Sequence, residues 1–197
     1  MHEPMTRRLT AADFDQELLI LFDAYVHGSL DRRGFLAQAQ KFAKAGVTAA
    51  GLLAALSPNF AAGQQAPADD ARLKIERVSY PSPQGNGTMK GYLVRPANAG
   101  TRKLPTVLVI HENRGLNPHI EDIARRLALD GFMAFAPDAL APLGGYPGNE
   151  DDARAAFAKL DQGKAREDFV AAVNWLKARP DTTGKIGAVG FCWGGGM

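Results

Sequence analysis

Residues 185–197 have the sequence Lys-Ile-Gly-Ala-Val-Gly-Phe-Cys-Trp-Gly-Gly-Gly-Met, and this stretch decides the fold of the chain. Its apolar part, residues 186–191, predicts a buried β-strand. Gly190 and Gly194 then flank Cys192 on either side. Glycines are needed where a strand turns at once into a helix, because a β-carbon there would collide with the backbone. The pattern therefore predicts a very tight turn that projects the side chain of Cys192 above a sheet.

Cys192 is the only cysteine of the chain, so it is either an apolar filler or a reactive thiol. Its place in a G-x-C-x-G-G element, which Gly195 completes, favours the thiol reading. The element is the counterpart of the G-x-S-x-G turn that presents a nucleophilic serine. Phosphate-binding loops also follow strands with glycines, but they continue with Lys and Ser or Thr, whereas Met197 stands here.

The segment from residue 71 to residue 197 alternates between strand and helix patterns. Residues 73–78 and 89–95 are predicted half-buried strands joined by a turn region, and the continuous apolar run 104–110 predicts a strand buried on both faces. Further helices and strands are expected over residues 118–130, 132–136, from 149, over 166–178 and over 186–191. Two strands in hairpin order followed by strand–helix alternation predict an α/β fold with a mostly parallel sheet flanked by helices.

Residues 1–70 have a different character. Thr10 and Asp13 form a capping-box-like start to an apolar-periodic helix. The pair Arg32-Arg33, followed by Phe35 and the uncharged run 46–56, resembles a twin-arginine export signal. That run has 11 residues, which is too short for the ~20 that a membrane-spanning helix needs.

Two features oppose an export signal, namely the long segment before Arg32 and the lysines between the arginine pair and the apolar run. The alternative is a small helical appendage that packs on the main domain. Both interpretations stay open at this point, and with them a periplasmic or a cytoplasmic location. Residues 66–71, rich in Ala, Pro and Asp, indicate a linker between the two parts.

The composition is that of a soluble globular protein, with 46% hydrophobic and 22% charged residues. The 23 basic and 21 acidic residues nearly balance, at a net charge of +2. Because no dense Lys/Arg run is present, the sequence gives no reason to expect a nucleic-acid partner. It makes no prediction of oligomeric state.

Residues 73–197 resemble the dienelactone hydrolase family, whose members are cysteine enzymes of the α/β-hydrolase superfamily. The resemblance is most specific in Val-Leu-Val-Ile-His-Glu-Asn-Arg-Gly-Leu (107–116), Ala-Pro-Asp (136–138) and Val-Gly-Phe-Cys-Trp-Gly-Gly (189–195). In that family the nucleophile also follows the fifth strand. The resemblance implies an acyl-thiol mechanism on a small ester or lactone, with neither a metal nor a cofactor.

The resemblance also assigns roles to particular residues. Cys192 corresponds to the nucleophile, and Glu112 to the glutamate that holds the resting thiol and helps to activate it. The backbone N–H groups of Asn113 and Trp193 would form the oxyanion hole. His111 lies beside these residues, but the family's base comes from a later loop, so we expect His111 to have a packing role.

One departure from the family concerns the substrate. The family's diagnostic enzyme has an arginine shortly after the Pro-Asp turn, which grips the substrate carboxylate, and residues 137–142 contain none. We therefore expect a neutral ester or lactone in place of dienelactone itself. Arg114 and Arg125 are the alternative cations near the site.

The other departure concerns the catalytic triad, which in this fold runs in the chain order nucleophile, acid, histidine. Only five residues follow Cys192, and all four histidines precede it. We therefore expect a truncated, inactive or nearly inactive portion of a cysteine hydrolase, with an unpaired sheet edge that is liable to aggregate. The alternative is a non-catalytic α/β protein whose N-terminal helices serve as an interaction module.

Overall fold

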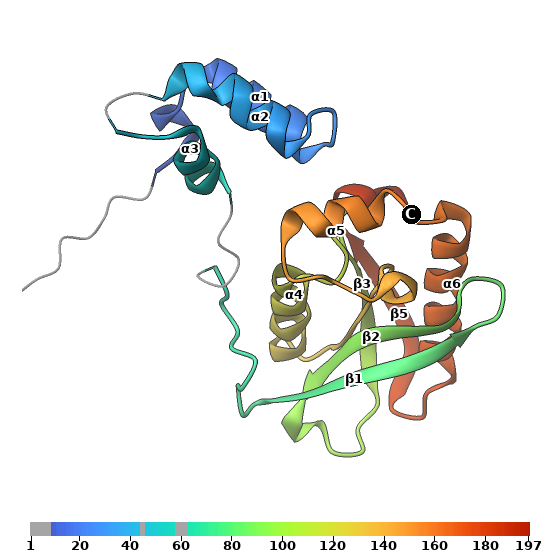
Figure 1. Cartoon of the computed structure of the whole chain (residues 1–197). Coiled ribbons are helices and arrows are strands. Elements are labelled where there is room, and N and C mark those ends of the chain that lie inside the picture. The colour runs from blue at the N-terminus through green and yellow to red at the C-terminus, as the bar shows by residue number, and fades with distance from the viewer. Residues whose placement is uncertain (1–8, 44–45, 58–62) are drawn as a thin grey trace, which may run out of the picture. The chain divides into compact units, whose positions relative to one another are not determined.

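The computed structural model of the chain describes residues 9–43, 46–57 and 63–197. The chain divides into two compact units (Figure 1), an N-terminal unit of residues 1–59 and a C-terminal unit of residues 60–197. Each unit has hydrophobic clusters of its own. Among the described residues, no helix has both the length and the apolar character required to cross a membrane.

The N-terminal unit is helical. Its elements in chain order are the 3-10 helix Ala11–Asp13, α1 (Gln16–Val26), α2 (Arg32–Ala39), the 3-10 helix Gln40–Phe42 and α3 (Ala49–Leu56). The predicted capping box of Thr10 and Asp13 is present, but it closes the first 3-10 turn, and α1 begins only after its own cap, Asp15. The helices share one buried cluster, made of Leu18, Tyr25, Phe35, Ala39, Ala49 and Leu53.

The C-terminal unit is built on a five-stranded sheet. Its strands are β1 (Leu73–Ser82), β2 (Gly87–Pro96), β3 (Leu104–Ile110), β4 (Met133–Pro137) and β5 (Thr182–Gly190), in the spatial order β1-β2-β4-β3-β5. The β3–β4 and β3–β5 pairs are parallel. Strand β2 runs antiparallel to both of its neighbours, so the sheet is mixed, and it is parallel only in the part that carries Cys192.

Helices cover both faces of this sheet (Figure 1). The elements are the 3-10 helix Ala97–Ala99, α4 (Pro118–Leu129), the 3-10 helix Ala141–Leu143, α5 (Glu150–Phe157), α6 (Gln162–Ala178) and the 3-10 helix Cys192–Gly196. Alternate residues of β4 serve the two faces: Ala134 and Ala136 pack in the α4 cluster, while Met133 and Phe135 pack in the α6 cluster. This arrangement explains why the strand is apolar at every position.

Helix α6 begins at Gln162, four residues before the predicted start, because the Asp161 side chain accepts a hydrogen bond from the Lys164 N–H and caps it. Helix α4 begins as expected, with Asn117 as its N-cap and Pro118 in its first turn. The side chain of Asp168 on α6 is fully buried and accepts hydrogen bonds from Asn86, in the β1–β2 turn. The hairpin is thereby fastened to the helix that covers it.

The segment between the two units belongs to the C-terminal one. Asp122 of α4 accepts hydrogen bonds from the backbone N–H groups of Gln65 and Ala66, at 3.0 and 2.9 Å. Arg125 of the same helix donates to the Ala66 carbonyl at 2.6 Å. These contacts place part of the predicted linker on the surface of the sheet-containing unit, and the boundary between the units precedes residue 66.

The parallel strands β3, β4 and β5 all end at the same edge of the sheet, and the loops that follow them meet there. Because ligands bind at the carboxyl ends of strands in open α/β sheets, this is where a site is expected. Strand β5 lies at the end of the strand order and pairs with β3 alone among the described strands.

Candidate active site

The turn at Cys192 has the geometry that the glycine pattern predicts. Cys192 has a φ of +52°, and it is the only non-glycine residue with a positive φ in the described part of the chain. A β-carbon at Gly190 would overlap the backbone of Gly194. One at Gly194 would lie 2.5 Å from the carbonyl oxygen of Ile110. The backbone is therefore strained at the residue that the turn presents, and its thiol is exposed.

Gly195 differs from the other two glycines. Its nearest neighbour for an added β-carbon is the carbonyl oxygen of Gly190 at 3.6 Å, an ordinary contact. The sterically required glycines of the turn are thus Gly190 and Gly194. After Cys192 the described chain continues as a short 3-10 helix.

Trp193 fastens the turn to three other elements. Its indole Nε1–H donates to Gln162 Oε1 at 2.8 Å, its ring stacks on His111 at 5.4 Å, and the Phe157 ring meets it edge-on at 4.9 Å. No described residue accepts a hydrogen bond from the backbone N–H of Trp193 or of Asn113. Two amide donors in the two loops assigned to the oxyanion hole are therefore free to bind a ligand.

His111 is fully buried, and both of its ring nitrogens are occupied. Nε2 accepts a hydrogen bond from the Ala139 N–H at 3.1 Å, so Nδ1 carries the proton and donates to the Glu112 carbonyl at 2.6 Å. Burial lowers the pKa of His111 below its usual 6.5. The side chain is thus a neutral brace between the loops after β3 and β4, and it has no nitrogen left to act as a base.

Glu112 follows His111 and is half-buried. Its Oε1 accepts a hydrogen bond from Asn117 Nδ2 at 3.0 Å, and Asn117 in turn caps α4 through the Ile120 N–H. Its Oε2 is buried and has no hydrogen-bond partner among the described residues. An unpaired buried carboxylate oxygen is costly, so its presence suggests a role in binding or proton transfer.

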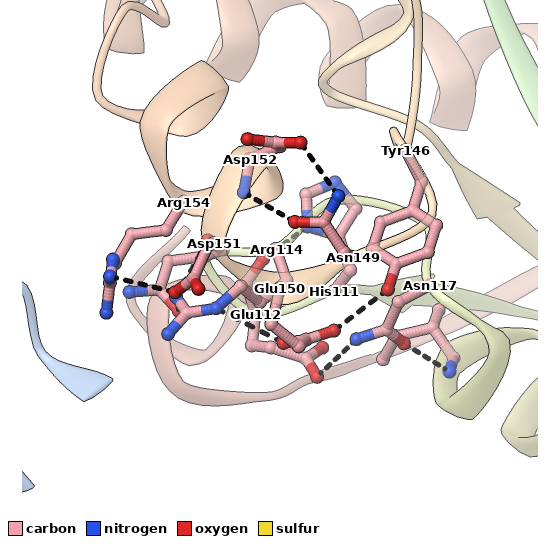
Figure 2. A network of polar contacts seen from close by, with 12 residues as sticks. His111, Glu112, Arg114, Asn117, Tyr146, Asn149, Glu150, Asp151, Asp152 and Arg154 are labelled. Carbon is pink, nitrogen blue, oxygen red and sulfur yellow. Dashed lines mark hydrogen bonds and ion pairs between the residues drawn. The ribbon is translucent and has the colours of Figure 1, made fainter. Parts of the chain in front are cut away.

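Arg114 belongs to the loop after β3, and its side chain is largely buried. Figure 2 shows its guanidinium beside Glu150, in the first turn of α5. Nη1 donates to Asn113 Oδ1 at 2.6 Å and to the Asn113 carbonyl at 3.1 Å, and Nε lies 3.2 Å from Glu150 Oε2. The Tyr146 hydroxyl donates to the other oxygen of Glu150 at 3.1 Å.

These groups perturb one another (Figure 2). Burial, followed by the nearby Glu150 charge, raises the pKa of Tyr146 to about 12. Burial also raises the pKa of Glu150, and the charges of Glu112 and Asp151 act in the same direction. The carboxylates of Glu112 and Glu150 are therefore close enough to interact electrostatically.

Neither alternative arginine offers a free cation for a substrate carboxylate. Arg125 has 1% of its surface exposed and donates hydrogen bonds to the Ala66 carbonyl and to the Tyr92 hydroxyl, neither of which belongs to the residues assigned to the thiol site. Arg114 is paired with Glu150.

A hollow of about 400 Å³ lies beside the middle of β1 and β2. Its lining includes Lys90, Leu116, Asp138 and Ala141, but none of the residues assigned to the thiol site. The hollow therefore does not define the surroundings of Cys192.

The sequence missed the contacts of Arg114, Glu150 and Tyr146. It indicates a helix start at Asn149, and the structure has one there, with the Asn149 side chain accepting from the Asp152 N–H. A capping pattern predicts where a helix begins, but it does not predict which residue the side chain of Glu150 in the first turn will contact. That contact depends on how α5 lies over the loop after β3.

Comparison with known proteins agrees with this geometry. Residues 89–197 match the model of the dienelactone hydrolase family, and residues 5–44 match that of the YqhI-like family. A protein of Escherichia coli (strain K12) named as the hydrolase fragment YghX is 49% identical over 115 residues, which are 58% of this chain and 97% of that protein.

Longer relatives are covered only in part. A protein of Methylorubrum extorquens named as a carboxymethylenebutenolidase is 33% identical over 117 residues, which are 57% of this chain and 40% of that protein. The crystal structure named as a dienelactone hydrolase from Klebsiella pneumoniae has 29% identity and a TM-score of 0.51, over 62% of this chain and 51% of that one. The chain thus spans about half or less of these two proteins. Because the family model covers more than half of the chain and the sheet and elbow agree with it, the chain belongs to the dienelactone hydrolase family.

Proposed function

We propose that these residues form the nucleophile-bearing part of a cysteine hydrolase that acts on a small ester or lactone. The observation that carries the proposal is the strained Cys192, which has a φ of +52° and an exposed thiol between two sterically required glycines. Backbone strain of this kind persists where the surrounding structure enforces it, and it is concentrated at functional sites. A cysteine that merely fills space needs neither the strain nor the exposure.

The proposed acylation uses groups from two loops. Glu112 Oε2 accepts the thiol proton of Cys192, and the thiolate sulfur attacks the carbonyl carbon of the substrate. The carbonyl oxygen becomes an oxyanion that accepts hydrogen bonds from the N–H groups of Asn113 and Trp193. The tetrahedral intermediate then collapses and the bond to the alcohol oxygen breaks. Glu112 returns the proton it accepted to that oxygen, so the alcohol group is released neutral while the acyl group stays on sulfur.

The substrate class follows from the charges around the site. Arg114 is already paired with Glu150, and Arg125 donates a hydrogen bond to the Ala66 carbonyl. Neither arginine is therefore placed to bind a substrate carboxylate. A neutral ester or lactone fits this environment better than an anionic one. The name of the M. extorquens relative, a carboxymethylenebutenolidase, supports a lactone as the substrate. The lactone in that name carries a carboxyl group, so the expectation of a neutral substrate rests on the paired arginines alone.

We propose further that the 197-residue chain stops at the acyl-thiol. Release of the acyl group needs a base that activates water, and the triad histidine of this fold follows the nucleophile in the chain. The histidines at 2, 27, 111 and 119 all precede Cys192. His111, in the loop after β3, has both ring nitrogens engaged in hydrogen bonds.

The test is a burst experiment with 4-nitrophenyl acetate. We expect the chain to release one nitrophenolate per Cys192 and then stop, with mass spectrometry locating the acetyl group on that residue. Cys192→Ala should give neither the burst nor the adduct. Sustained turnover would contradict the arrest at the acyl-thiol. A folded chain that forms no adduct would contradict the hydrolase proposal and favour a non-catalytic role.

A further inference from the structure

A chain of polar contacts joins the start of α5 to the loop that holds an oxyanion-hole donor. Tyr146 donates to Glu150, and Glu150 pairs with Arg114 (Figure 2). Arg114 in turn donates twice to Asn113. Asn113 is the residue whose backbone N–H is assigned to the oxyanion. The two bonds from Arg114 reach both the side-chain oxygen and the carbonyl of Asn113.

This arrangement restrains Asn113 in a specific way. The amide group of its side chain and the peptide group on its carboxyl side are bound to the same guanidinium nitrogen, so rotation of the residue would break both bonds. The side chain of Arg114 has 7% of its surface exposed, and burial of its charge would be costly if Glu150 did not lie beside it. Glu150 therefore keeps Arg114 in place, and Arg114 keeps Asn113 in place.

We propose that Arg114 and Glu150 are positioning residues for the oxyanion hole, with Glu150 on α5 acting through Arg114 on the orientation of Asn113. The inference rests on the proposed acyl transfer to Cys192. It assigns α5 a part in catalysis although no residue of α5 reaches the reacting atoms in this scheme. The pair would be needed for reactions that build negative charge on a carbonyl oxygen, and for no others.

Two reactions of Cys192 separate this role from a general effect on the thiol. Acylation by 4-nitrophenyl acetate forms an oxyanion. Alkylation by iodoacetamide forms a sulfur–carbon bond as iodide leaves the methylene carbon, and no oxyanion develops. Misplacement of a hole donor should slow only the first reaction, whereas loss of the base at Glu112 should slow both.

The variants are Arg114→Lys and Glu150→Gln. Lysine keeps the positive charge but cannot present the planar fork that bonds to Asn113 and Glu150 together. Complete loss of one oxyanion donor costs about 10²–10³ in rate, so a displaced donor should lower the acylation rate constant about tenfold. The double variant should lose little more than Arg114→Lys alone, because the two residues act in series.

Two exposed residues of α5 and α4 provide matched control variants. Asp152→Asn makes the same carboxylate-to-amide change at an exposed site in the first turn of α5, and Arg126→Lys makes the arginine change at an exposed site on α4. Both should acylate and alkylate like the parent chain. The thermal unfolding midpoint of every variant shows whether the fold is kept.

The expected result is slow acylation with unchanged alkylation in Arg114→Lys and Glu150→Gln. Acylation at the parent rate in folded Arg114→Lys would overturn the inference while leaving the proposed function intact. Equal slowing of both reactions would also overturn it, since that is the mark of a general structural role. Absence of acylation in the parent chain would overturn the proposed function, and the inference with it.

Discussion

The glycines that follow Cys192 differ in their steric surroundings. Gly194 faces the carbonyl oxygens of Ile110 and His111, whereas Gly195 faces only the Gly190 backbone at an ordinary distance. A side chain at Gly194 would meet backbone atoms, which cannot turn away as a flexible side chain can. The strained conformation of Cys192 thus depends on contact between the turn and the end of β3.

This difference predicts that Gly194→Ala and Gly195→Ala behave unlike each other. Gly194→Ala should lower the free energy of unfolding by about 1–3 kcal/mol, the usual cost of overpacking, and should slow alkylation of Cys192 by iodoacetamide. Gly195→Ala is the matched control and should change both quantities little. Denaturant unfolding and the alkylation rate measure the two effects. Equal stability of the two variants would contradict the steric argument.

His111 predicts a pH dependence of stability. Burial holds the pKa of His111 below the value of 6.5 expected in the unfolded chain. As the pH falls below 6.5, the unfolded state therefore binds a proton at His111 more readily than the folded state does. The stability that neutral His111 contributes is present above pH 6.5 and is lost as the pH falls below it, by up to about 1.4 kcal/mol per pH unit.

Comparison with His111→Gln tests this dependence. Glutamine can still accept from the Ala139 N–H but does not titrate, so this variant should be the less stable one at pH 7.5. The difference in free energy of unfolding from the parent chain should then narrow towards pH 5.5. A difference that stays constant between these two pH values would rule out His111 as the titrating group.

At the scale of elements, α4 does more than cover the sheet. Its buried Asp122 binds two backbone N–H groups, and its buried Arg125 binds the carbonyl of Ala66, so the segment around Ala66 is docked on the helix. Arg125 Nη2 lies 3.6 Å from Asp122 Oδ1, which neutralises both charges within the interface.

Removal of one partner of this pair should therefore be costly. Asp122→Ala leaves the buried Arg125 with only the more distant Glu121, at 3.9 Å, and removes the acceptor of two backbone N–H groups. It should lower the free energy of unfolding by about 3 kcal/mol. It should also make the chain near Gln65 more sensitive to limited proteolysis. Arg126→Ala, an exposed change on the same helix, should stay within about 0.5 kcal/mol of the parent chain. Similar losses in the two variants would contradict a structural role for the docked segment.

Local signals predicted most elements, and the exceptions have physical causes. Asn117 and Pro118 mark the start of α4, and Asn149 marks the start of α5, because capping involves residues within one turn of each other. The antiparallel hairpin of β1 and β2 was predicted, whereas the antiparallel pairing of β2 with β4 was not. The direction of β2 next to β4 depends on the order of strands in space, and residues far apart in the chain decide it.

At the scale of the whole molecule, the two units have separate cores. Phe35 is fully buried in the cluster of the N-terminal unit and contributes to neither cluster of the C-terminal unit. Phe35→Ala should cost about 3–5 kcal/mol in the N-terminal unit, which is enough to unfold a small helical unit. Circular dichroism should show the loss of helix, while alkylation of Cys192 proceeds as in the parent chain. Slower alkylation in the variant would show that the units are energetically coupled.

The N-terminal unit also carries the arginine pair of the export hypothesis. Arg32 and Arg33 are exposed in the first turn of α2, while Phe35 and Leu53 from the apolar part are buried in the unit's own core. We therefore expect replacement of both arginines by lysine to leave the cellular location unchanged. Cell fractionation measures this, and a shift from periplasm to cytoplasm in the lysine variant would restore the export hypothesis.

The sequence by itself determined the features that depend on neighbouring residues. The glycines around Cys192 determined the tight turn there, the apolar run 104–110 determined β3, and the motif 107–116 pointed to the family. Only the tertiary structure decided that His111 is a neutral brace, that Arg114 and Arg125 are already paired, and that Glu150 lies against the loop of Asn113. The roles of His111, Arg114 and Glu150 depend on segments that meet at one edge of the sheet, and the role of Arg125 depends on the docking of residues 65–66 on α4. No spacing within the chain encodes such contacts. The turn at Cys192 depends on residues adjacent to it in the sequence, whereas the charged groups around it are brought there by the tertiary fold.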